Sequence, residues 1–316
     1  MDASQSLIQG IIIILAVISL ATLLKNFKVF KKDDSLLLSK LVLKVTLPAL
    51  IFHSLAIQEF HSEFLTMAAI MAIIEIGIIM LAWLIGTLLK FRPAEKGALI
   101  LVSAFGMTSF LGYPVIAQVF PDNAMAMEEA VVTSEFGVGL LLFIFGPLIA
   151  MYYGSSKVEG KVLIGSVRNF FVSPIFISLV AGAGFSFIPI DEGNDIYMAF
   201  LRFFKLIGDA NMLLVTFTLG LLMEFKRINN AIVFVSIAVL LKLLVKPLFS
   251  VWLTELPQFT DMMREIVFIE TALPSAILGV VFAKQYNCRP ELVSIAIVVT
   301  LLLSVVTVPL LFVLFF

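Results

Sequence analysis

The chain has 316 residues, of which 61% are hydrophobic and 14% are charged, and its formal net charge is −1. Soluble proteins contain about 25% charged residues, so this chain has too few charges to cover the surface of a soluble domain. The composition excludes a soluble enzyme, a nucleic-acid-binding protein and a disordered protein. Long apolar runs favour membrane-spanning helices over a membrane barrel.

The first apolar run, residues 7–24, is predicted to be a retained membrane span. Only Asp2 precedes it with a charge, and several lysines follow it. A secretory signal peptide has positive charge before its apolar core, which is the reverse of this pattern.

Ten segments in all have the apolar character of a span of about 20 residues. They are residues 7–24, 36–56, 64–89, 98–120, 127–152, 170–189, 197–224, 231–253, 266–283 and 291–315. Every second connection between them carries two to four Lys or Arg residues, whereas the alternate connections carry only Arg264. Because positive connections stay in the cytoplasm, both termini are predicted to lie outside it.

The connection at residues 154–169 divides the chain into an N-terminal repeat (1–153) and a C-terminal repeat (170–316), each with five spans. An odd number of spans puts the two repeats in opposite orientations. The predicted fold is therefore an all-α polytopic membrane protein with two inverted repeats of five helices, which is typical of secondary transporters.

The fourth and ninth spans contain matching interruptions. Residues 104–114 combine two glycines, hydroxyl side chains and Pro114, and residues 270–275 contain Pro274 and Ser275. Proline removes a backbone donor, and exposed backbone in a membrane is tolerated only where protein or a cavity satisfies it. The sequence predicts unwound helices near 106–112 and 272–275 that form a transport site, with ordinary kinks as the alternative.

Three stretches resemble the auxin efflux carrier family, which includes bacterial organic-acid carriers and plant auxin exporters: residues 40–52, 105–114, and 273–275 followed by 282–286. The resemblance implies a scaffold of spans one, two, six and seven and a mobile transport domain of spans three to five and eight to ten. It implies that the broken helices cross at the substrate site and that transport is elevator-like. It also implies a homodimer, formed through spans two and seven, in the plasma (bacterial inner) membrane.

This resemblance also assigns the substrate-binding residues. The corresponding positions in this chain are Gly106, Met107, Thr108, Ser109, Gly112, Pro114, Leu273, Pro274 and Ser275. Met107 stands where the family commonly has Asn, and Ser109 stands where it has Gly, so the substrate of relatives does not transfer directly. Residues 269–271 are similar to the ninth helix of bile acid:sodium symporters, a related fold, which makes sodium near Glu270 an alternative to a proton.

Charged residues inside spans are costly and therefore mark function by default. The coupling candidates are Glu75, Glu135, Glu270 and Lys242, with Glu75 or Glu270 as the expected partner of Lys242. Asp209 is a further acidic candidate, and Lys246 a further basic one.

Other charges have simpler interpretations. Lys40 and Lys44 can extend to the interface, and Glu128 and Glu129 are expected to be interfacial. His53 and His61 are also expected near the outer surface, and Arg202 and Lys205 are expected in an amphipathic approach to span seven.

Taken together, these features predict a secondary transporter of a small carboxylate rather than an enzyme. The sequence has no nucleotide-binding, hydrolase or metal-ligand motif, so no cofactor is expected apart from a coupling ion, H⁺ or Na⁺. The expected partners are the carboxylate, the lipid bilayer and a second copy, with no nucleic acid. The alternatives are a sodium-coupled symporter, a channel or a non-transporting membrane sensor.

Overall fold

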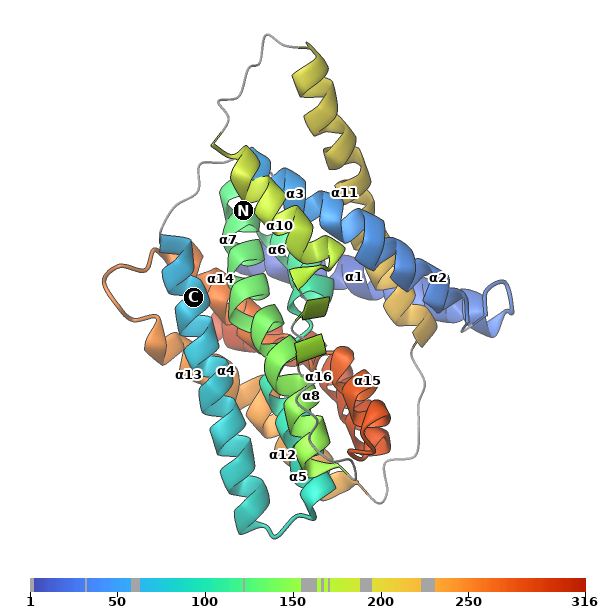
Figure 1. The fold of residues 1–316 in the computed structure, drawn as a ribbon, viewed down its shortest axis with the longest axis vertical. Helices are drawn as coiled ribbons and strands as arrows, with labels where there is room; N and C mark the ends of the chain where they lie inside the picture. Colours follow the sequence, from blue (N-terminus) through green and yellow to red (C-terminus); the bar gives the residue numbers. More distant parts are fainter. Residues whose placement is uncertain are drawn as a thin grey trace. The chain divides into compact units, whose positions relative to one another are not determined.

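A computed structural model describes residues 3–31, 33–57, 63–121, 123–154, 164–165, 168–169, 171–187, 195–222 and 231–316. The described part is helical and contains no β-strand, only one isolated bridge between two non-helical positions (Figure 1). His61 and much of the predicted 154–169 connection lie outside the described residues.

The helices follow the predicted segments in order. In the N-terminal half they are α1 (Ala3–Asn26), α2 (Asp34–Leu41), α3 (Leu47–Ala56), α4 (Glu63–Leu88), α5 (Pro93–Ala104), α6 (Tyr113–Val119), α7 (Ala124–Val132) and α8 (Leu140–Tyr153). In the C-terminal half they are α10 (Pro174–Phe185), α11 (Asp195–Leu222), α12 (Ile232–Leu240), α13 (Lys246–Leu253), α14 (Asp261–Ala272), α15 (Leu278–Gln285) and α16 (Pro290–Phe315).

Among the described residues, four short π-helical segments join some of these helices end to end. They are η1 (Val42–Thr46), η2 (Thr108–Gly112), η3 (Thr133–Gly139) and η4 (Leu241–Val245). Pro48 and Pro247 lie at the first turn of the helices that follow η1 and η4. A proline has no N–H to donate and its ring crowds the preceding turn, so a wider turn before it keeps the helix continuous.

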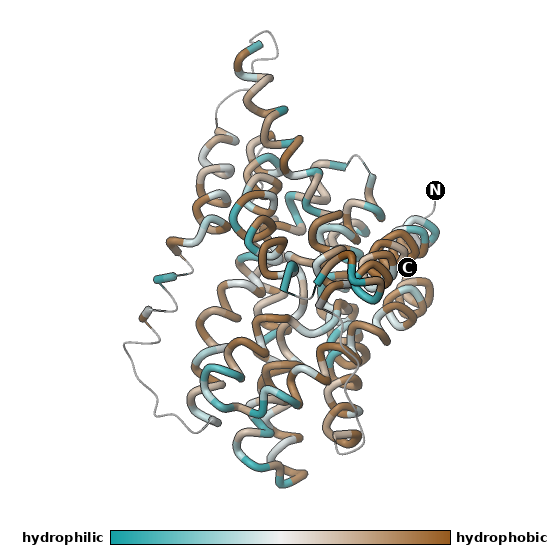
Figure 2. Tube along the Cα trace, turned by 90° about the vertical axis from the view of Figure 1, so that its right-hand side faces the viewer, coloured by the Kyte–Doolittle hydropathy of each residue, from teal (hydrophilic) through white to brown (hydrophobic). Residues whose placement is uncertain are grey.

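Within the part of the chain that the structure describes, six helical stretches are long and apolar enough to cross a membrane, namely Gln5–Asn26, Asp34–Ala56, Phe64–Leu88, Ala124–Tyr153, Ile232–Leu253 and Pro290–Phe315. Hydrophobic residues dominate most of the helices in Figure 2, and many are exposed, such as Ile12, Met80 and Leu310. Apolar surface of this extent is compatible with lipid, not with water. The protein is therefore an integral membrane protein.

The remaining predicted spans are less regular. Segment 170–189 corresponds to the shorter apolar helix α10. Segment 197–224 corresponds to the long α11, which carries Arg202, Lys205 and Asp209 and is not among the six. Segments 98–120 and 266–283 are each interrupted, between α5 and η2 and between α14 and α15.

The chain forms two compact units. The first contains residues 1–62, 109–131 and 171–223, and the second contains 63–108, 132–170 and 224–316. In the first unit α3 packs against α10 and α11, and α1 packs against α6 and α11. Phe52 of α3 lies in its core, with the rings of Phe185 and Phe204 5.5 and 4.4 Å away.

In the second unit, several helices pack around α5. This helix packs against α4, α8 and α16, while α14 packs against α13 and α16. The residues of α5 from Gly97 to Ala104 are buried, and so are those of α14 from Ile266 to Ala272. Both interrupted helices therefore end inside the unit, where the carbonyl groups of their last turns need partners other than water.

Candidate functional site

The two interruptions are short extended stretches at the ends of α5 and α14. Phe105 has φ −84° and ψ 133°, and Leu273 has φ −61° and ψ 154°. The residue before a proline avoids the helical region, so Pro274 explains the extended Leu273. Gly106 lies at the other interruption, where proline plays no part.

The limits of unwinding differ from those predicted. Residues 108–112 are π-helical and Ala272 is still helical, so the non-helical stretches are 105–107 and 273–277. Pro114, which suggested a longer break, lies in the first turn of α6. That helix follows η2 directly, and the wider π-helical turn before it accommodates the proline ring and the missing N–H, as at Pro48 and Pro247.

The two stretches pair with each other. Gly106 and Ser275 form an antiparallel bridge. The Met107 N–H donates to the Pro274 carbonyl and the Ala276 N–H donates to the Phe105 carbonyl, both at 2.9 Å. This pairing satisfies backbone groups that would otherwise be exposed in an apolar interior.

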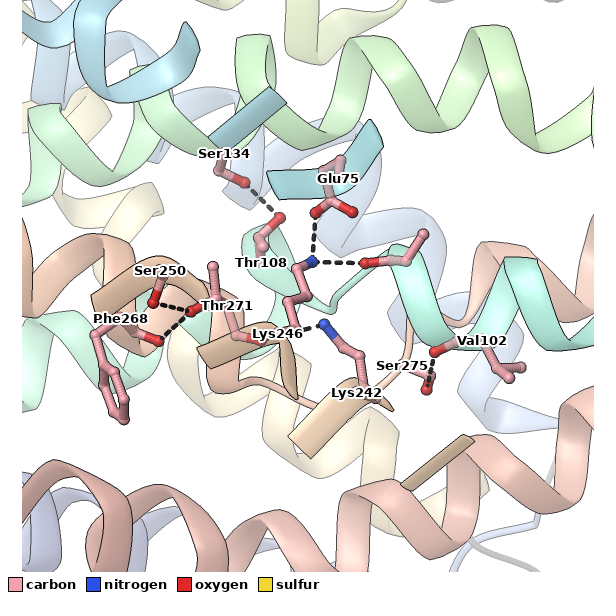
Figure 3. A network of polar contacts seen from close by, with 11 residues as sticks. Glu75, Val102, Thr108, Ser134, Lys242, Lys246, Ser250, Phe268, Thr271 and Ser275 are labelled. Carbon is pink, nitrogen blue, oxygen red and sulfur yellow. Dashed lines mark hydrogen bonds and ion pairs between the residues drawn. The ribbon is translucent and has the colours of Figure 1, made fainter. Parts of the chain in front are cut away.

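Side chains satisfy the carbonyl groups at the ends of both helices. The Ser275 hydroxyl donates to the Val102 carbonyl at 2.6 Å, and the Lys246 ammonium donates to the Ala104 carbonyl at 2.5 Å (Figure 3). The Lys242 ammonium donates to the Thr271 carbonyl at 3.4 Å. A lysine thus lies at the negative end of α5 and another at the negative end of α14, where a positive charge is stabilised.

Both lysines come from the same helical stretch, one turn apart, and both are fully buried. The carboxylate of Glu75 on α4 forms an ion pair with Lys246 at 2.5 Å (Figure 3). Glu75 therefore forms its ion pair with Lys246. The described residues contain no ion pair of Lys242 with Glu75 or Glu270, and the expected partner of Lys242 stays a prediction. Lys246 is among the basic candidates in the sequence, and its spacing of four residues from Lys242 indicates that both face the same side of the helix.

Two further predicted carboxylates are buried in the second unit. Neither carboxylate oxygen of Glu270 has a hydrogen-bond partner in the described part of the chain, and the same holds for the second oxygen of Glu75. Glu135 lies in the π-helical segment η3 and is 3% exposed. A buried carboxylate without partners is unfavourable when charged, so Glu270 is suited to take up a proton or a cation.

Several hydroxyl side chains lie in or next to the paired stretches and form hydrogen bonds there. The Ser134 hydroxyl donates to the Thr108 hydroxyl at 2.6 Å, and the Thr271 hydroxyl donates to that of Ser250 at 2.9 Å. The Thr300 hydroxyl lies 3.2 Å from that of Ser275 and accepts from the Ser275 N–H. These groups can exchange partners, which gives the site polar contacts without a net charge.

The predicted substrate residues do not all lie together. The structure brings Gly106, Met107 and Thr108 together with Leu273, Pro274 and Ser275 in the second unit. Ser109, Gly112 and Pro114 continue the chain in the first unit, where Pro114 lines a cavity.

Several other charged residues lie outside the paired stretches. Glu128 and Glu129 are each 1% exposed, so neighbouring parts of the protein cover them, and their expected place at the membrane interface stays a prediction. They occupy α7, whose apolar neighbours carry them into the interior. Asp209 is exposed and paired with Lys205, and Lys40 and Lys44 are exposed. The described residues contain no cluster of three or more His, Cys, Asp or Glu side chains that could hold a metal ion.

Comparison with known proteins places this architecture in a family. Residues 6–312 match the membrane transport protein family. An uncharacterized transporter of Methanocaldococcus jannaschii is 23% identical over 95% of this chain and 96% of its own length. An uncharacterized transporter of Methanothermobacter thermautotrophicus is 24% identical over 96% of both. Auxin efflux carrier component 8 of Arabidopsis thaliana is 20% identical over 65% of this chain and 67% of its own length. The chain is therefore a membrane transporter that belongs to the auxin efflux carrier family.

Proposed function

We propose that the protein is a secondary active transporter that moves a small organic anion, a carboxylate, by an elevator-like alternating-access mechanism. The observation that carries this proposal is the pairing of two interrupted helices through Gly106 and Ser275. Interrupted helices near mid-membrane present helix ends and backbone groups to a solute without exposing an unsatisfied backbone to lipid.

The chemistry around the pair favours an anion. η2 and α15 begin directly after the two interruptions, and the start of a helix carries a partial positive charge. Thr108 and Ser275 bring hydroxyl groups to the same place. A carboxylate can be held by such groups without a dedicated arginine, while Met107 supplies an apolar contact where relatives have Asn.

The division into two units supports an elevator. The first unit contains α1, α2–α3, α10 and α11, which correspond to the proposed scaffold spans one, two, six and seven. It also contains α6 and most of α7, which belong to spans four and five. The second contains α4, α5, α8 and α12–α16, which correspond to most of the proposed transport domain. In this proposal the chain has ten spans in two inverted repeats, 1–153 and 170–316, both termini lie outside the cytoplasm, and two copies associate through spans two and seven in the bacterial inner membrane.

Coupling to protons or to the membrane potential is favoured over coupling to sodium. The carbonyl ends of α5 and α14 could hold a cation, but the ammonium groups of Lys246 and Lys242 already lie against them. The two lysine side chains already supply positive charge to these carbonyl groups, which disfavours a sodium ion beside them. Glu270 remains as a carboxylate that can exchange a proton during the transport cycle.

Uptake of carboxylates into proteoliposomes tests the proposal. A panel of short-chain, dicarboxylic and aromatic acids is offered with a pH gradient, with a membrane potential, with a sodium gradient and with none. Saturable uptake of a carboxylate, driven by the pH gradient or the potential, is expected. Uptake driven only by sodium would support the symporter instead, and uptake of no carboxylate by folded protein would overturn the proposed substrate class.

A further inference from the structure

A cavity of about 230 Å³ lies within the second unit, apart from the residues that form the paired stretches. It is found where α5, α12 and α16 begin. α12 packs against both other helices, and the rings of Phe91 and Phe234, which line the cavity, are 6.2 Å apart. The connections that precede these three helices carry Lys or Arg, so this end of the helices is predicted to face the cytoplasm.

Apolar side chains form one side of this cavity and reach the surface of the protein. Leu292, Ile232 and Val233 line the cavity together with the two phenylalanines. Ile232 and Val233 are 63% and 61% exposed, and both lie at the start of a helical stretch that is long and apolar enough to cross a membrane. Exposed apolar side chains at such a position are in contact with lipid. This side of the cavity is therefore next to lipid acyl chains.

Charged groups form the other side of the cavity. The guanidinium of Arg289, which is 43% exposed, lies between two carboxylates: its Nε atom is 3.0 Å from Glu291, and its Nη2 atom is 3.7 Å from Glu95. Arg289 and Glu95 both line the cavity. The Nη1 group of Arg289 forms no ion pair with the described residues, so the guanidinium still has N–H donors for a bound anion. One positive and two negative charges thus alternate at this side, and a ligand that is only negative would be repelled by the carboxylates.

A ligand that fits this arrangement has a negative group with a positive group close to it. Guanidinium groups bind phosphate with two parallel hydrogen bonds, which makes phosphate the anion that suits Arg289. A primary ammonium has three N–H donors for carboxylates, whereas a trimethylated ammonium has none. Phosphatidylethanolamine carries a phosphate, a primary ammonium two carbon atoms further on, and acyl chains for the apolar side. Pockets between membrane helices at the cytoplasmic surface are places where lipid head groups bind.

We propose that this cavity binds the head group of phosphatidylethanolamine. The phosphate accepts hydrogen bonds from the Arg289 guanidinium, the ammonium donates to the carboxylates of Glu95 and Glu291, and the acyl chains lie beside Ile232 and Val233. This lipid site is independent of the proposed transport function, because it needs neither a substrate nor a change of conformation.

Native mass spectrometry of the purified protein in detergent, with one lipid added at a time, tests the choice of head group. Phosphatidylcholine with the same acyl chains is the matched lipid, since it has the same net charge but no N–H donor. We expect phosphatidylethanolamine to bind several-fold more tightly than phosphatidylcholine and than the anionic phosphatidylglycerol. Equal binding of phosphatidylethanolamine and phosphatidylcholine would overturn the proposal, and so would tighter binding of phosphatidylglycerol.

Variants of the charged groups locate the site. Arg289 has a left-handed backbone, with φ 49°, which asparagine adopts more readily than most residues, so Arg289→Asn should fold. This variant should bind phosphatidylethanolamine about tenfold more weakly, as expected for the loss of hydrogen bonds to a charged group. Lys28→Asn is the matched control, since Lys28 is an exposed basic residue with φ 61° in the first unit.

Glu291→Gln tests the contact with the ammonium. Glu291 is 52% exposed, so its replacement should not disturb the fold, and the preference for phosphatidylethanolamine over phosphatidylcholine should fall several-fold. Unchanged binding of phosphatidylethanolamine by Arg289→Asn would contradict the proposal. An equal loss of binding in Lys28→Asn would also contradict it, because the lipid would then respond to basic residues in general.

Discussion

Lys246 and Glu75 form an ion pair in which both side chains are 0% exposed. Removing one partner of such a pair leaves an uncompensated charge in the interior, which costs about 3–5 kcal/mol. Lys246 also donates to the last carbonyl of α5, so the pair connects α4, α13 and the interruption. The stability of this ion pair therefore depends on the geometry of the proposed transport site.

We predict that Glu75→Gln lowers the free energy of unfolding by about 3 kcal/mol or more. The double variant Glu75→Gln/Lys246→Met should recover most of this loss, because it removes both charges. Thermal unfolding in detergent measures both. Asp261→Asn is the control, since Asp261 is 94% exposed and 3.9 Å from Arg264. If Glu75→Gln were no more destabilising than Asp261→Asn, the buried pair would not have the role inferred here.

Glu270 lies four residues before Pro274, and its carboxylate is buried without a hydrogen-bond partner in the described part of the chain. Glu270→Gln keeps the size of the side chain and removes its charge. We predict that this variant folds and binds the carboxylate but no longer responds to the pH gradient. Uptake with and without the gradient measures this, and gradient-driven uptake at the wild-type rate would exclude Glu270 as the coupling group. A purely structural Glu270 would instead change stability and leave coupling intact.

At the scale of elements, close contact between α3 and α11 depends on Gly208. A methyl group added at Gly208 would lie 2.9 Å from the Cα atom of Leu50 and 3.2 Å from its nitrogen. Backbone atoms cannot move away as a flexible side chain can. Gly184, in α10 of the same unit, has nothing within 4 Å of the corresponding position.

We therefore predict that Gly208→Ala lowers the free energy of unfolding by about 1–3 kcal/mol, as overpacking does. Gly184→Ala should leave it unchanged or slightly raised, because alanine favours a helix. Thermal unfolding of the two variants, followed by the fluorescence of the two tryptophans, compares them directly. Equal effects of the two substitutions would show that α3 and α11 are not in close contact.

The positions of most helices could be predicted from two features of the sequence: the length of each apolar stretch and the placement of Lys and Arg between the stretches. Neither feature depends on how the helices pack against one another. The π-helical segments could not be predicted, since they depend on which backbone groups pair within a continuous apolar stretch. Pro114 led to the prediction of too long a break, because the sequence does not show that a π-helical segment keeps the helix continuous before it. Lys242 and Lys246 share a helix face, and only the packing of α4 decides which of them meets Glu75.

For the whole molecule, the distribution of Lys and Arg predicts Asn123 outside the cytoplasm and Gly160 inside it. Single cysteine substitutions at these positions, labelled in intact cells with an impermeant maleimide, should react for Asn123→Cys and not for Gly160→Cys. The native cysteine will not interfere, because burial raises the pKa of the Cys288 thiol to about 12 and keeps it protonated below that pH. Labelling of both variants from the same side would contradict the predicted orientation.

A carrier with alternating access binds its solute on one side at a time, whereas a channel is open to both sides. The pairing of two interrupted helices through Gly106 and Ser275 is the geometry from which a carrier is inferred. Counterflow separates the two mechanisms and needs no ion gradient.

In the counterflow experiment, proteoliposomes are loaded with a high concentration of an unlabelled carboxylate that the uptake panel identifies, and are then diluted into a trace of the same compound with a radioactive label. Exchange through alternating access predicts that the label rises transiently above its equilibrium level inside the vesicles and then falls. A label that approaches equilibrium steadily, with no overshoot, would contradict the carrier mechanism.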